Sequence, residues 1–574
     1  MVYKKLKRLM MNFSLSSLKN YLGNDLTDTL IEWTTEGNQL FTKNRLISLI
    51  ITVHGLSILA NKDFRRDLYR RMSSDEIISI RDFLSKKYSG EMDLQVIIDE
   101  AANLPWKKSD VNLKILSILE LPENIFDVEK VENISENVIE SFNKFFELLD
   151  YQYVIRQKAL GILSSNIELP RFLIHMPTGT GKTKTATHII CHHYNYNINK
   201  KGLIIWIAHT KELLQQAYDT FESVWRHIGN GKIHTYKLWG DNEINFSQSH
   251  LNGFMVCGIQ KLIALERNNP EIFEKLVNDA ALIVFDEAHK ASASETRRVV
   301  EKFMIKKANM SNRALMGLSA TPGRSTQQSF DNVILSSMFE NRIIRIDTRL
   351  MNAINMSEQK AINSEVETDI IKYFQNRRIL SKVIKEELVY NQQLSPQELE
   401  KIRVSATDNG YDDFTASALE IIGKNKDRNF RIMQKLRELN EENIPTIVFA
   451  CSVKHCQLLS AMLTIEGIPN SLVTGNMNPI DRAKAIEKFK DKENKTNILI
   501  NYEVLTTGFD STNIKCVFIA RPTQSIVLYS QMIGRGLRGP QMGGNETCLL
   551  IDVKDNLSQY DENMAFSHFD SYWS

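Results

Sequence analysis

The spacing of apolar residues divides the chain into a helical first part and a later part in which strands alternate with helices. Over residues 1–147, apolar positions recur three and four apart, as in LKNYLGNDLTDTLIEW and NVIESFNKFFELL, which is the period of an amphipathic helix. After residue 148, short apolar β-branched runs such as RFLIHM, GLIIWIAH and ALIVFDEAH end in polar or glycine-containing loops. Such runs predict a parallel sheet that binds ligands at the carboxyl ends of its strands.

A second series of apolar runs begins near residue 444 and predicts a second α/β lobe. IPTIVFACS, TNILINYEVL and IKCVFIAR are again separated by helical segments. The stretch between the two series is charged and poor in glycine, and SPQELEKI in it has the serine and proline of a helix start. We therefore expect an α/β fold with five parts: a helical accessory domain (1–147), lobe 1 (148–324), a mostly helical connector partly packed on lobe 2 (325–430), lobe 2 (431–557) and a C-terminal tail (558–574).

Composition changes this picture little. The 574 residues are too many for one ordinary core, and 43% of them are hydrophobic, so most of the chain can fold. The formal net charge is only +2, which excludes a basic field over the whole surface and confines any nucleic-acid contact to a local groove. The six cysteines include no CxxC pair, so we expect reduced core residues rather than a zinc site or a disulfide framework.

The most apolar N-terminal run is LISLIITVHGLSILA, at residues 46–60. Polar residues interrupt it, and it is shorter than the roughly 20 apolar residues of a bilayer span, so it predicts a buried helix and no membrane contact. The first residues lack the apolar region of a signal peptide, so we expect a cytoplasmic protein, nucleoid-associated if bacterial. Carboxylates scattered over residues 1–147 fit solvated helix faces better than a nuclease site.

The first chemical motif is MPTGTGKT, at residues 176–183, between a predicted strand and a predicted helix. That context is the one a phosphate-binding loop requires, although Met176 stands where the strict pattern has glycine. Backbone amides of such a loop close around phosphates, a lysine reaches the β and γ phosphates of ATP, and a hydroxyl faces Mg²⁺. The predicted nucleotide-binding residues are Thr178, Gly179, Thr180, Gly181, Lys182 and Thr183.

A carboxylate pair follows about a hundred residues later, at the end of the run AALIVFDEAH. Next to a phosphate loop, a carboxylate at a strand end can hold the magnesium ion, while its neighbour orients the attacking water. We therefore predict that Asp286, with Thr183, contacts the metal and that Glu287 is the catalytic base. His289, directly after Asp-Glu-Ala, is predicted to couple the site to its surroundings.

These motifs, taken with others in the same order, resemble those of the superfamily 2 helicases and translocases. DEAH at 286, SATP at 319 and QMIGRGLR at 531 follow PTGTGKT, and VLTTGFD and RPTQS are most similar to the group of RadD, XPB and the type I restriction motors. The resemblance covers residues 150–555 and implies two RecA-like lobes with ATP between them. It implies adenine recognition by Gln157, although YVIRQKA departs from the usual arginine, any residue, tyrosine, glutamine spacing. It also implies coupling by Ser319, Thr321 and Gln531, and ribose contacts by Gly508 and Asp510.

The second lobe has no phosphate loop of its own, so it must contribute residues to the first site. Charge grows on the γ-phosphate during phosphoryl transfer, and an arginine from another element stabilises it strongly. Arg535 and Arg538 are three residues apart near a predicted helix end, so both can face the same side. We predict that both are catalytic.

The resemblance further implies a track for a nucleic-acid backbone across both lobes. AHTKEL at 208–213, GIQKL at 258–262 and VTGN at 473–476 are similar to nucleic-acid-contacting motifs of the superfamily. The implied contacts are Thr210, Lys211, Gln260, Thr474, Gly475 and Thr506. DNA, as a single strand or a fork, is the expected substrate, in repair or anti-phage defence, and RNA stays open. The alternative is an ATP-gated clamp that recruits protein partners through residues 1–147 with little unwinding.

Overall fold

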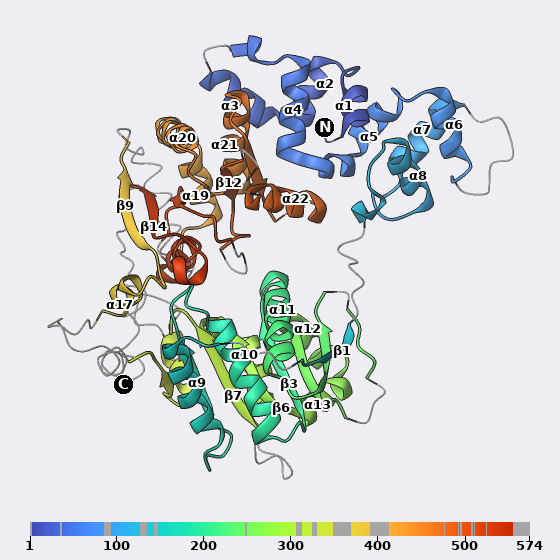
Figure 1. Cartoon of the computed structure of the whole chain (residues 1–574). Helices are drawn as coiled ribbons and strands as arrows, with labels where there is room; N and C mark the ends of the chain where they lie inside the picture. The colour runs from blue at the N-terminus through green and yellow to red at the C-terminus, as the bar shows by residue number, and fades with distance from the viewer. Residues whose placement is uncertain are drawn as a thin grey trace.

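The computed structural model describes most of the chain, and its described parts form two α/β lobes and one helical module. In Figure 1 the N-terminal module (blue) lies beside lobe 2 (orange to red), and lobe 1 (green) lies below both. The described residues are 3–34, 37–84, 93–126, 135–142, 147–240, 242–246, 250–305, 313–323, 330–347, 369–390, 413–475, 477–491, 493, 496–506, 509, 511–523 and 525–554.

Lobe 1 is built on an eight-stranded sheet in the order β1-β4-β5-β3-β6-β7-β2-β8. Its neighbouring strands are parallel except for β1, which runs antiparallel to β4. The strands are β1 (Glu136–Glu140), β2 (Arg171–His175), β3 (Leu203–Ala208), β4 (Lys232–Leu238), β5 (Gly253–Gly258), β6 (Ala280–Asp286), β7 (Ala314–Ser319) and β8 (Ile343–Ile344).

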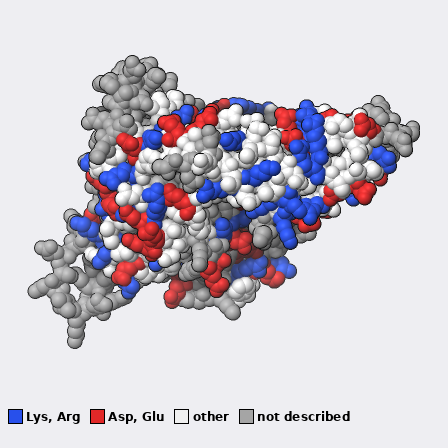
Figure 2. Space-filling view, turned by 90° about the horizontal axis from the view of Figure 1, so that it is seen from above, with Lys and Arg blue, Asp and Glu red and all other residues white. Residues whose placement is uncertain are grey.

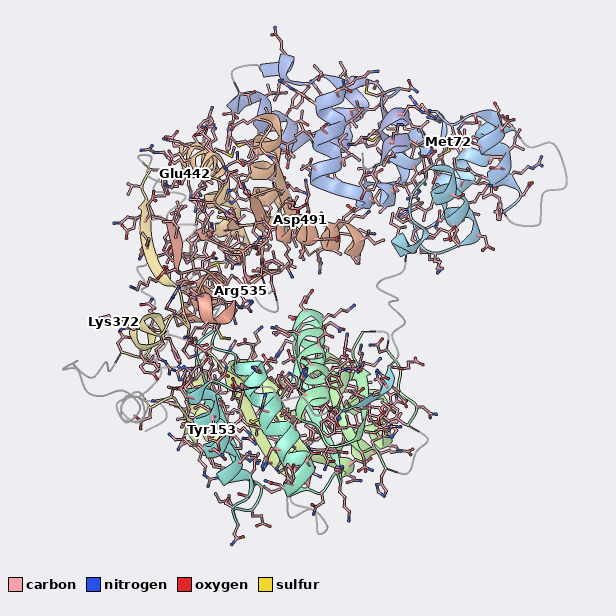
Figure 3. All side chains as sticks on the ribbon, in the orientation of Figure 1. Met72, Tyr153, Lys372, Glu442, Asp491 and Arg535 are labelled. Carbon is pink, nitrogen blue, oxygen red and sulfur yellow. The ribbon has the colours of Figure 1, made fainter. Side chains whose placement is uncertain are left out.

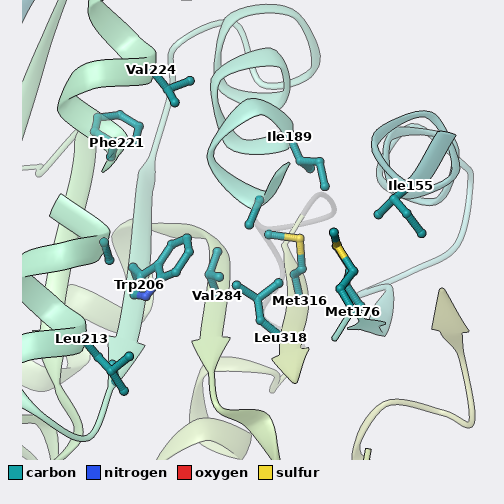
Figure 4. Packing of buried hydrophobic residues seen from close by; sticks show 14 of the residues in the cluster. Ile155, Met176, Ile189, Trp206, Leu213, Phe221, Val224, Val284, Met316 and Leu318 are labelled. Carbon is teal, nitrogen blue, oxygen red and sulfur yellow. The ribbon is translucent and has the colours of Figure 1, made fainter. Parts of the chain in front are cut away.

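Helices cover both faces of this sheet, as its apolar central strands require. On one face lie α9 (Asp150–Leu163), α10 (Lys182–His192), the one-turn η4 (His193–Asn197) and α11 (Lys211–Ile228). On the other lie α12 (Ile259–Asn268), α13 (Pro270–Asp279), η5 (Ala288–Ser292), α14 (Ser294–Phe303) and α15 (Phe330–Met338). Figure 4 shows Trp206 of β3, Val284 of β6 and Met316 of β7 packed with Ile189 of α10 and Phe221 of α11.

Lobe 2 is built on a six-stranded parallel sheet in the order β11-β12-β10-β13-β14-β9. Its strands are β9 (Lys382–Leu388), β10 (Thr446–Phe449), β11 (Asn470–Val473), β12 (Ile498–Asn501), β13 (Cys516–Ile519) and β14 (Thr547–Val553). Its helices are α19 (Ala416–Gly423), α20 (Lys426–Glu441), α21 (Val453–Ile465), α22 (Pro479–Lys490), α23 (Ile526–Ile533) and η6 (Pro540–Met542), and α17 (Ile370–Asn376) leads into it.

The α/β fold with two parallel-sheet lobes and a helical N-terminal region is confirmed, but two predicted boundaries are wrong. Strand β1 places residues 136–140 in lobe 1, so the described helical domain ends at residue 126. The described parts of 325–430 contain the predicted helices, but they are not a separate connector, because β8 joins the first sheet and β9 the second. SPQELEKI, the helix start expected in that stretch, lies outside the described residues.

The N-terminal module (residues 3–126) consists of helices and short turns of helix. The predicted buried helix at 46–60 is confirmed, since Leu46, Leu49 and Ile50 are buried. Among the described residues no single helix is long and apolar enough to cross a membrane, and Lys43–Ala60 with Lys62–Tyr69 meets that test only as a pair bent by 94°. The elements are α1 (Lys4–Met10), α2 (Leu15–Leu22), α3 (Asn24–Trp33), η1 (Gly37–Leu40), α4 (Lys43–His54), η2 (Gly55–Ala60), α5 (Lys62–Tyr69), α6 (Ser74–Arg81), α7 (Leu94–Asn103), α8 (Asp110–Ile118) and η3 (Glu123–Phe126).

The module and lobe 2 share one hydrophobic core. Helices α3 and α4 pack against α21, and apolar side chains of the module and of lobe 2 belong to a single buried cluster. At its edge the buried carboxylate of Asp481 accepts hydrogen bonds from the Tyr3 hydroxyl and the Leu56 amide, both at 2.6 Å. A Cβ on Gly55, whose φ is +56°, would lie 2.4 Å from Asp481 Oδ2, so only glycine fits there. The module is therefore fastened to lobe 2.

Charge on the upper surface is mixed. Figure 2 shows Lys and Arg side chains interspersed with Asp and Glu on this face, with no continuous field of one sign. This agrees with the net charge of +2. On this face, therefore, any contact with nucleic acid has to come from particular residues rather than from a field of one sign.

Candidate functional site: a nucleotide cavity between the lobes

The phosphate loop connects β2 to α10. Gly179 and Gly181 have φ values of +86° and +79°, a left-handed conformation that glycine adopts without strain. Gly181 is also the N-cap of α10, so Lys182 and Thr183 form the helix's first turn. Backbone amides in the first turn of a helix have no acceptor within the helix, and Lys182 and Thr183 line the space in front of the loop, so this turn is a natural anion site.

A cavity of about 320 Å³ lies in front of this loop, between the lobes. It brings together residues about 350 positions apart in the sequence, because lobe 2 closes the site that lobe 1 opens. Its lobe 1 wall is Pro177, Thr178, Gly179, Gly181, Lys182, Thr183, Lys184, Leu213, Gln216, Thr220, Asp286 and Glu287. Its lobe 2 wall is Phe509, Thr512, Gly534, Arg535, Arg538 and Met542.

The carboxylate pair lies opposite the loop lysine. Lys182 Nζ is 3.9 Å from Asp286 Oδ1 and 3.6 Å from Glu287 Oε1. Burial raises the pKa of Asp286, whereas the positive charges of Lys182, Lys290 and Arg535 outweigh burial and hold the pKa of Glu287 below its usual range. Glu287 also has a left-handed backbone, with φ +52°, which is strain of the kind found at functional sites. An ionised Glu287 in the cavity wall is suited to accept a proton from water.

The residues present fit a magnesium ion that arrives with the nucleotide. Thr183 and Asp286, the two predicted metal contacts, both line the cavity and both offer the oxygen ligands that Mg²⁺ prefers. In the described part of the chain no group of three His, Cys, Asp or Glu side chains could hold a metal on its own. Such a site suits Mg²⁺, which takes most of its ligands from phosphates and water.

The two predicted catalytic arginines line the cavity from lobe 2, across from the phosphate loop. Figure 3 marks Arg535, which lies just beyond α23 on the side of lobe 2 nearest lobe 1. Arg535 donates from Nη1 to the Phe509 carbonyl at 2.6 Å and from Nε to the Gln531 carbonyl at 3.2 Å. Burial lowers the pKa of Arg535 to about 10 and also lowers the pKa of Arg538, so Arg535 stays charged at neutral pH. The lobes meet closely here, since a Cβ on Gly534 would lie 2.5 Å from Thr178 Cγ2.

Residues 369–390, here called the linking segment, hold the arginine pair against lobe 1. Leu380 forms an antiparallel bridge with Arg538, and the buried Ser381 hydroxyl lies 2.7 Å from the carbonyl oxygens of both Arg538 and Asn545. On the lobe 1 side, Arg377 pairs with Asp150 at 2.9 Å. A Cβ on Gly179 of the phosphate loop would be 3.3 Å from Leu380. Sequence reasoning missed this segment, because it contains no motif with recognisable chemistry.

The predicted adenine-reading residue, Gln157, is in the wrong place. Its side chain is exposed and donates to the Tyr153 hydroxyl at 2.6 Å on the outside of α9. Gln152, which is 1% exposed, instead donates to the Thr180 carbonyl of the phosphate loop at 3.0 Å. Five helical residues turn the chain through about 500°, so the two glutamines point in different directions. Tyr151 and Gln152 match the tyrosine and glutamine that end the usual adenine-recognition pattern. Sequence reasoning overlooked this match.

Thr180 also requires a correction. Its hydroxyl donates to the Pro177 carbonyl at 2.7 Å, and its own carbonyl accepts from the Tyr151 hydroxyl at 2.7 Å. The side chain is buried and is absent from the cavity wall. Thr180 therefore shapes the loop rather than facing a nucleotide. Gly508 and Asp510 lie outside the described residues, although Phe509 and Thr512 beside them line the cavity.

Three of the predicted coupling residues are interconnected in lobe 1. His289 Nδ1 is 3.3 Å from Glu287 Oε2 and 3.4 Å from Ser319 Oγ. The Ser319 hydroxyl accepts from the Thr321 amide at 3.1 Å. Burial lowers the pKa of His289 to about 3, so its ring is neutral at physiological pH. On lobe 2 the buried amide nitrogen of Gln531 has no hydrogen-bond partner among the described residues.

The predicted nucleic-acid contacts lie just after the carboxyl ends of strands in both sheets. Thr210 caps α11, where its hydroxyl accepts from the Leu213 amide, and Lys211 and Gln260 are exposed. In lobe 2 Gly475 is exposed, Thr474 is largely buried, and the Thr506 hydroxyl donates to the Glu503 carbonyl at 2.7 Å. Thr210 and Thr506 therefore have structural hydrogen bonds of their own, and the whole set stays a prediction.

Two protein-family models match the chain. One, described as type III restriction enzyme, res subunit, matches residues 129–324, and the other, helicase conserved C-terminal domain, matches 429–539. The first range includes β1, in agreement with the corrected start of lobe 1. Together the two ranges contain every residue of the cavity wall except Met542.

Curated relatives extend this similarity. IRC3 of Saccharomyces cerevisiae, by name an ATP-dependent helicase, is 26% identical over 399 residues, which are 68% of this chain and 49% of IRC3. The EcoAI type I restriction enzyme endonuclease subunit of Escherichia coli is 25% identical over 411 residues, 67% of this chain and 43% of that protein. The chain thus spans about half the length of these relatives.

A viral relative matches more of the chain. Helicase 22 of a Sulfolobus islandicus filamentous virus is 22% identical over 535 residues, which are 92% of this chain and 82% of the viral protein. The N-terminal module is longer than the part of the chain that this match leaves out, so most of the module lies within the match. The module is therefore part of the similarity as well.

Proposed function

Because the chain belongs to the superfamily 2 helicases and translocases, with type I restriction motors among its relatives, we propose that it is an ATP-dependent motor acting on DNA. The observation that carries the proposal is the cavity itself, where a phosphate loop and a carboxylate pair from lobe 1 meet two arginines from lobe 2. A site assembled from two lobes is sensitive to their relative position. Binding and hydrolysis of the nucleotide can therefore be converted into lobe movement.

The proposed mechanism uses four side chains of the cavity. Lys182 and the amides of the phosphate loop hold the β and γ phosphates, and Glu287 orients water for attack and takes its proton. Arg535 and Arg538 stabilise the negative charge that develops on the phosphoryl group. Mg²⁺, when bound near Thr183 and Asp286, would neutralise phosphate charge. The Asp-Glu-Ala-His sequence at 286–289 supports a DEAH-type variant of this site.

The decisive experiment measures ATP turnover with single-stranded DNA, duplex DNA, forked DNA and RNA, together with strand displacement on the forks. We expect turnover to rise with DNA and to vanish in Lys182→Ala and Glu287→Gln. Near-normal hydrolysis in either variant would refute the site. ATP-dependent DNA binding without displacement or translocation would favour a clamp that recruits partners through the N-terminal module, and stimulation by RNA alone would favour an RNA helicase.

A further inference from the structure

A cluster of aromatic and polar side chains on lobe 1 lies outside the nucleotide cavity. It forms where α9 packs against α10 and η4, and Figure 1 shows α9 and α10 side by side. Its members, here called the α9–α10 cluster, are Tyr153 and Arg156 of α9, His192 at the end of α10 and Tyr196 of η4. None of the four lines the cavity, and Figure 3 places Tyr153 at the edge of lobe 1. The cluster is therefore accessible whether or not a nucleotide is bound.

The two tyrosine rings of the cluster are exposed and already positioned. Tyr153 is 49% exposed and Tyr196 is 64% exposed. The Gln157 amide donates to the Tyr153 hydroxyl at 2.6 Å, and the ring centroids of His192 and Tyr196 are 4.8 Å apart. Rings held in this way lose little conformational entropy when a partner covers them. Tyrosine is enriched at protein interfaces and among the residues that contribute most of the binding energy.

The guanidinium of Arg156 lies beside these rings. Its central carbon is 5.8 Å from the centroid of Tyr153. Burial and the charge of Arg156 lower the pKa of His192, so that ring is near the guanidinium as well and is neutral at physiological pH. Within the described part of the chain no carboxylate pairs with Arg156, and its buried Nε has no hydrogen-bond partner. A partly buried guanidinium is stabilised when an anion accepts its hydrogen bonds, so this one is suited to an anion from another molecule.

The backbone under the cluster departs from ordinary helix geometry. Helix α10 ends at His192, and the residues that follow, His193–Asn197, form a π-helical turn. Such turns are uncommon and occur frequently at functional sites. His193 is 2% exposed, and neither of its ring nitrogens has a hydrogen-bond partner among the described residues. Since one nitrogen of a neutral imidazole always carries a proton, hydrogen bonding within the described chain does not account for this turn.

We propose that the α9–α10 cluster binds an acidic peptide segment of a partner protein. A carboxylate of the segment pairs with Arg156, because guanidinium and carboxylate match in charge and in fork geometry. An apolar or aromatic side chain next to that carboxylate packs on Tyr153 and Tyr196. A nucleic-acid strand fits less well, because a backbone track needs several cations in succession and the cluster has one.

This inference goes beyond the proposed function, because the partner binds without occupying the nucleotide cavity. Helix α10 begins with Lys182 and Thr183 of the phosphate loop and ends at His192. The partner therefore attaches to the same helix that holds the phosphates, at its opposite end. Lobe 1 can then carry a second protein while the motor works.

The test measures binding of a short fluorescein-labelled peptide, made of Gly-Asp-Phe-Ser repeats, to the full chain by anisotropy. We expect binding in the micromolar range, and no binding of the matching peptide with lysine in place of aspartate. Arg156→Gln should weaken binding about tenfold, because a charge-assisted hydrogen bond is lost, and Tyr196→Ser about fivefold. ATP turnover in both variants should equal that of the wild-type chain, which verifies that they fold.

Arg431→Gln is the matched control, because Arg431 is exposed on α20 of lobe 2 and bonds there to Gln434 at 3.0 Å. It removes the same charge far from the cluster in sequence and should leave peptide binding unchanged. Equal affinities of the two arginine variants, equal binding of the acidic and basic peptides, or no binding of the acidic peptide to the wild-type chain would overturn the inference. A single-stranded oligonucleotide that binds the wild-type chain but not Arg156→Gln would identify a nucleic-acid site instead. In none of these cases is the proposed function refuted, since ATP turnover tests it separately.

Discussion

Gln152 and Gln157 lie five positions apart on α9, and only Gln152 reaches the phosphate loop. We expect Gln152→Ala to weaken ATP binding about fivefold, because the loss of a buried hydrogen bond costs about 0.5–1.5 kcal/mol and leaves the Thr180 carbonyl bonded to the Tyr151 hydroxyl alone of its two side-chain donors. Titration with a fluorescent ATP analogue measures this. Gln157→Ala is the control on the same helix and should bind normally, and equal losses in both variants would contradict the assignment.

Gly534 marks the point where α23 meets the phosphate loop. Gly534→Ala places a methyl group 2.5 Å from Thr178 Cγ2, so the arginines that follow cannot approach the phosphates. Hydrolysis should fall at least tenfold while ATP binding to lobe 1 changes little, as steady-state turnover and nucleotide titration would show. Gly161→Ala adds the same group to α9 where no atom lies within 4 Å, and its turnover should be normal.

Residues with strong chemical constraints were the easiest to locate from the sequence. The loop from Thr178 to Thr183, the Asp286–Glu287 pair and the two arginines are defined by spacing and flanking strands, and all but Thr180 line the cavity. Gln157 and Thr180 were misjudged, because the orientation of their side chains depends on helix phase and loop hydrogen bonds. Those are set by packing that a linear pattern does not contain.

At the scale of elements, the linking segment makes contacts between the lobes that no sequence motif predicted. Ser381 is buried, and its hydroxyl lies at hydrogen-bonding distance from two carbonyls on either side of the turn that follows the arginine pair. Ser381→Ala should lower the free energy of unfolding by about 1–3 kcal/mol, since those carbonyls lose a buried donor, and should lower turnover more than ATP affinity. Thermal unfolding and kinetics measure the two effects.

Ser337→Ala provides the comparison for that change. The Ser337 side chain is exposed on α15, and within the described part of the chain its hydroxyl bonds only to the Ile334 carbonyl one turn earlier. Its loss should change stability by less than about 0.5 kcal/mol. Equal effects of the two serine variants would show that the linking segment has no special role.

Two strands at the edges of the sheets, β1 and β9, were among the elements that periodicity failed to predict. β1 has one buried residue, Ile139, and β9 is rich in Lys and Glu, so neither shows the apolar run of a central strand. Edge strands need fewer apolar residues and carry charges that discourage further pairing. The central strands β3 and β5 are buried along their whole length and are therefore apolar throughout, so the sequence pattern identified them correctly.

At the scale of the whole molecule, the N-terminal module and lobe 2 are joined so that they move together. Gly55→Ala should separate them, because its Cβ would displace the Asp481 carboxylate and uncover a shared apolar core. Calorimetry should show a lower or divided unfolding transition and stronger binding of a hydrophobic dye. Gly37→Ala, with a similar φ of +54° and no neighbour within 4 Å, carries the backbone strain alone. Matching results for both glycines would exclude a specific docking contact.

The docking of the module could have been anticipated from α21. Its buried residues include Cys456, Leu459, Ala461 and Met462, which lie on different sides of the helix. A surface helix has one apolar stripe, whereas a helix that is apolar all round needs two partners. The sheet is one of them, but the sequence does not say which distant segment is the other, because that depends on shape rather than on pattern.

The shared core also limits how this protein can lose or exchange parts during evolution. A related motor without the N-terminal module would leave one side of α21 in water, where an uncovered apolar face promotes self-association. Such a relative should carry polar side chains on that side of the helix, or cover it with another domain. The residues on that side of α21 therefore indicate, in any homologous sequence, whether the protein has an N-terminal module.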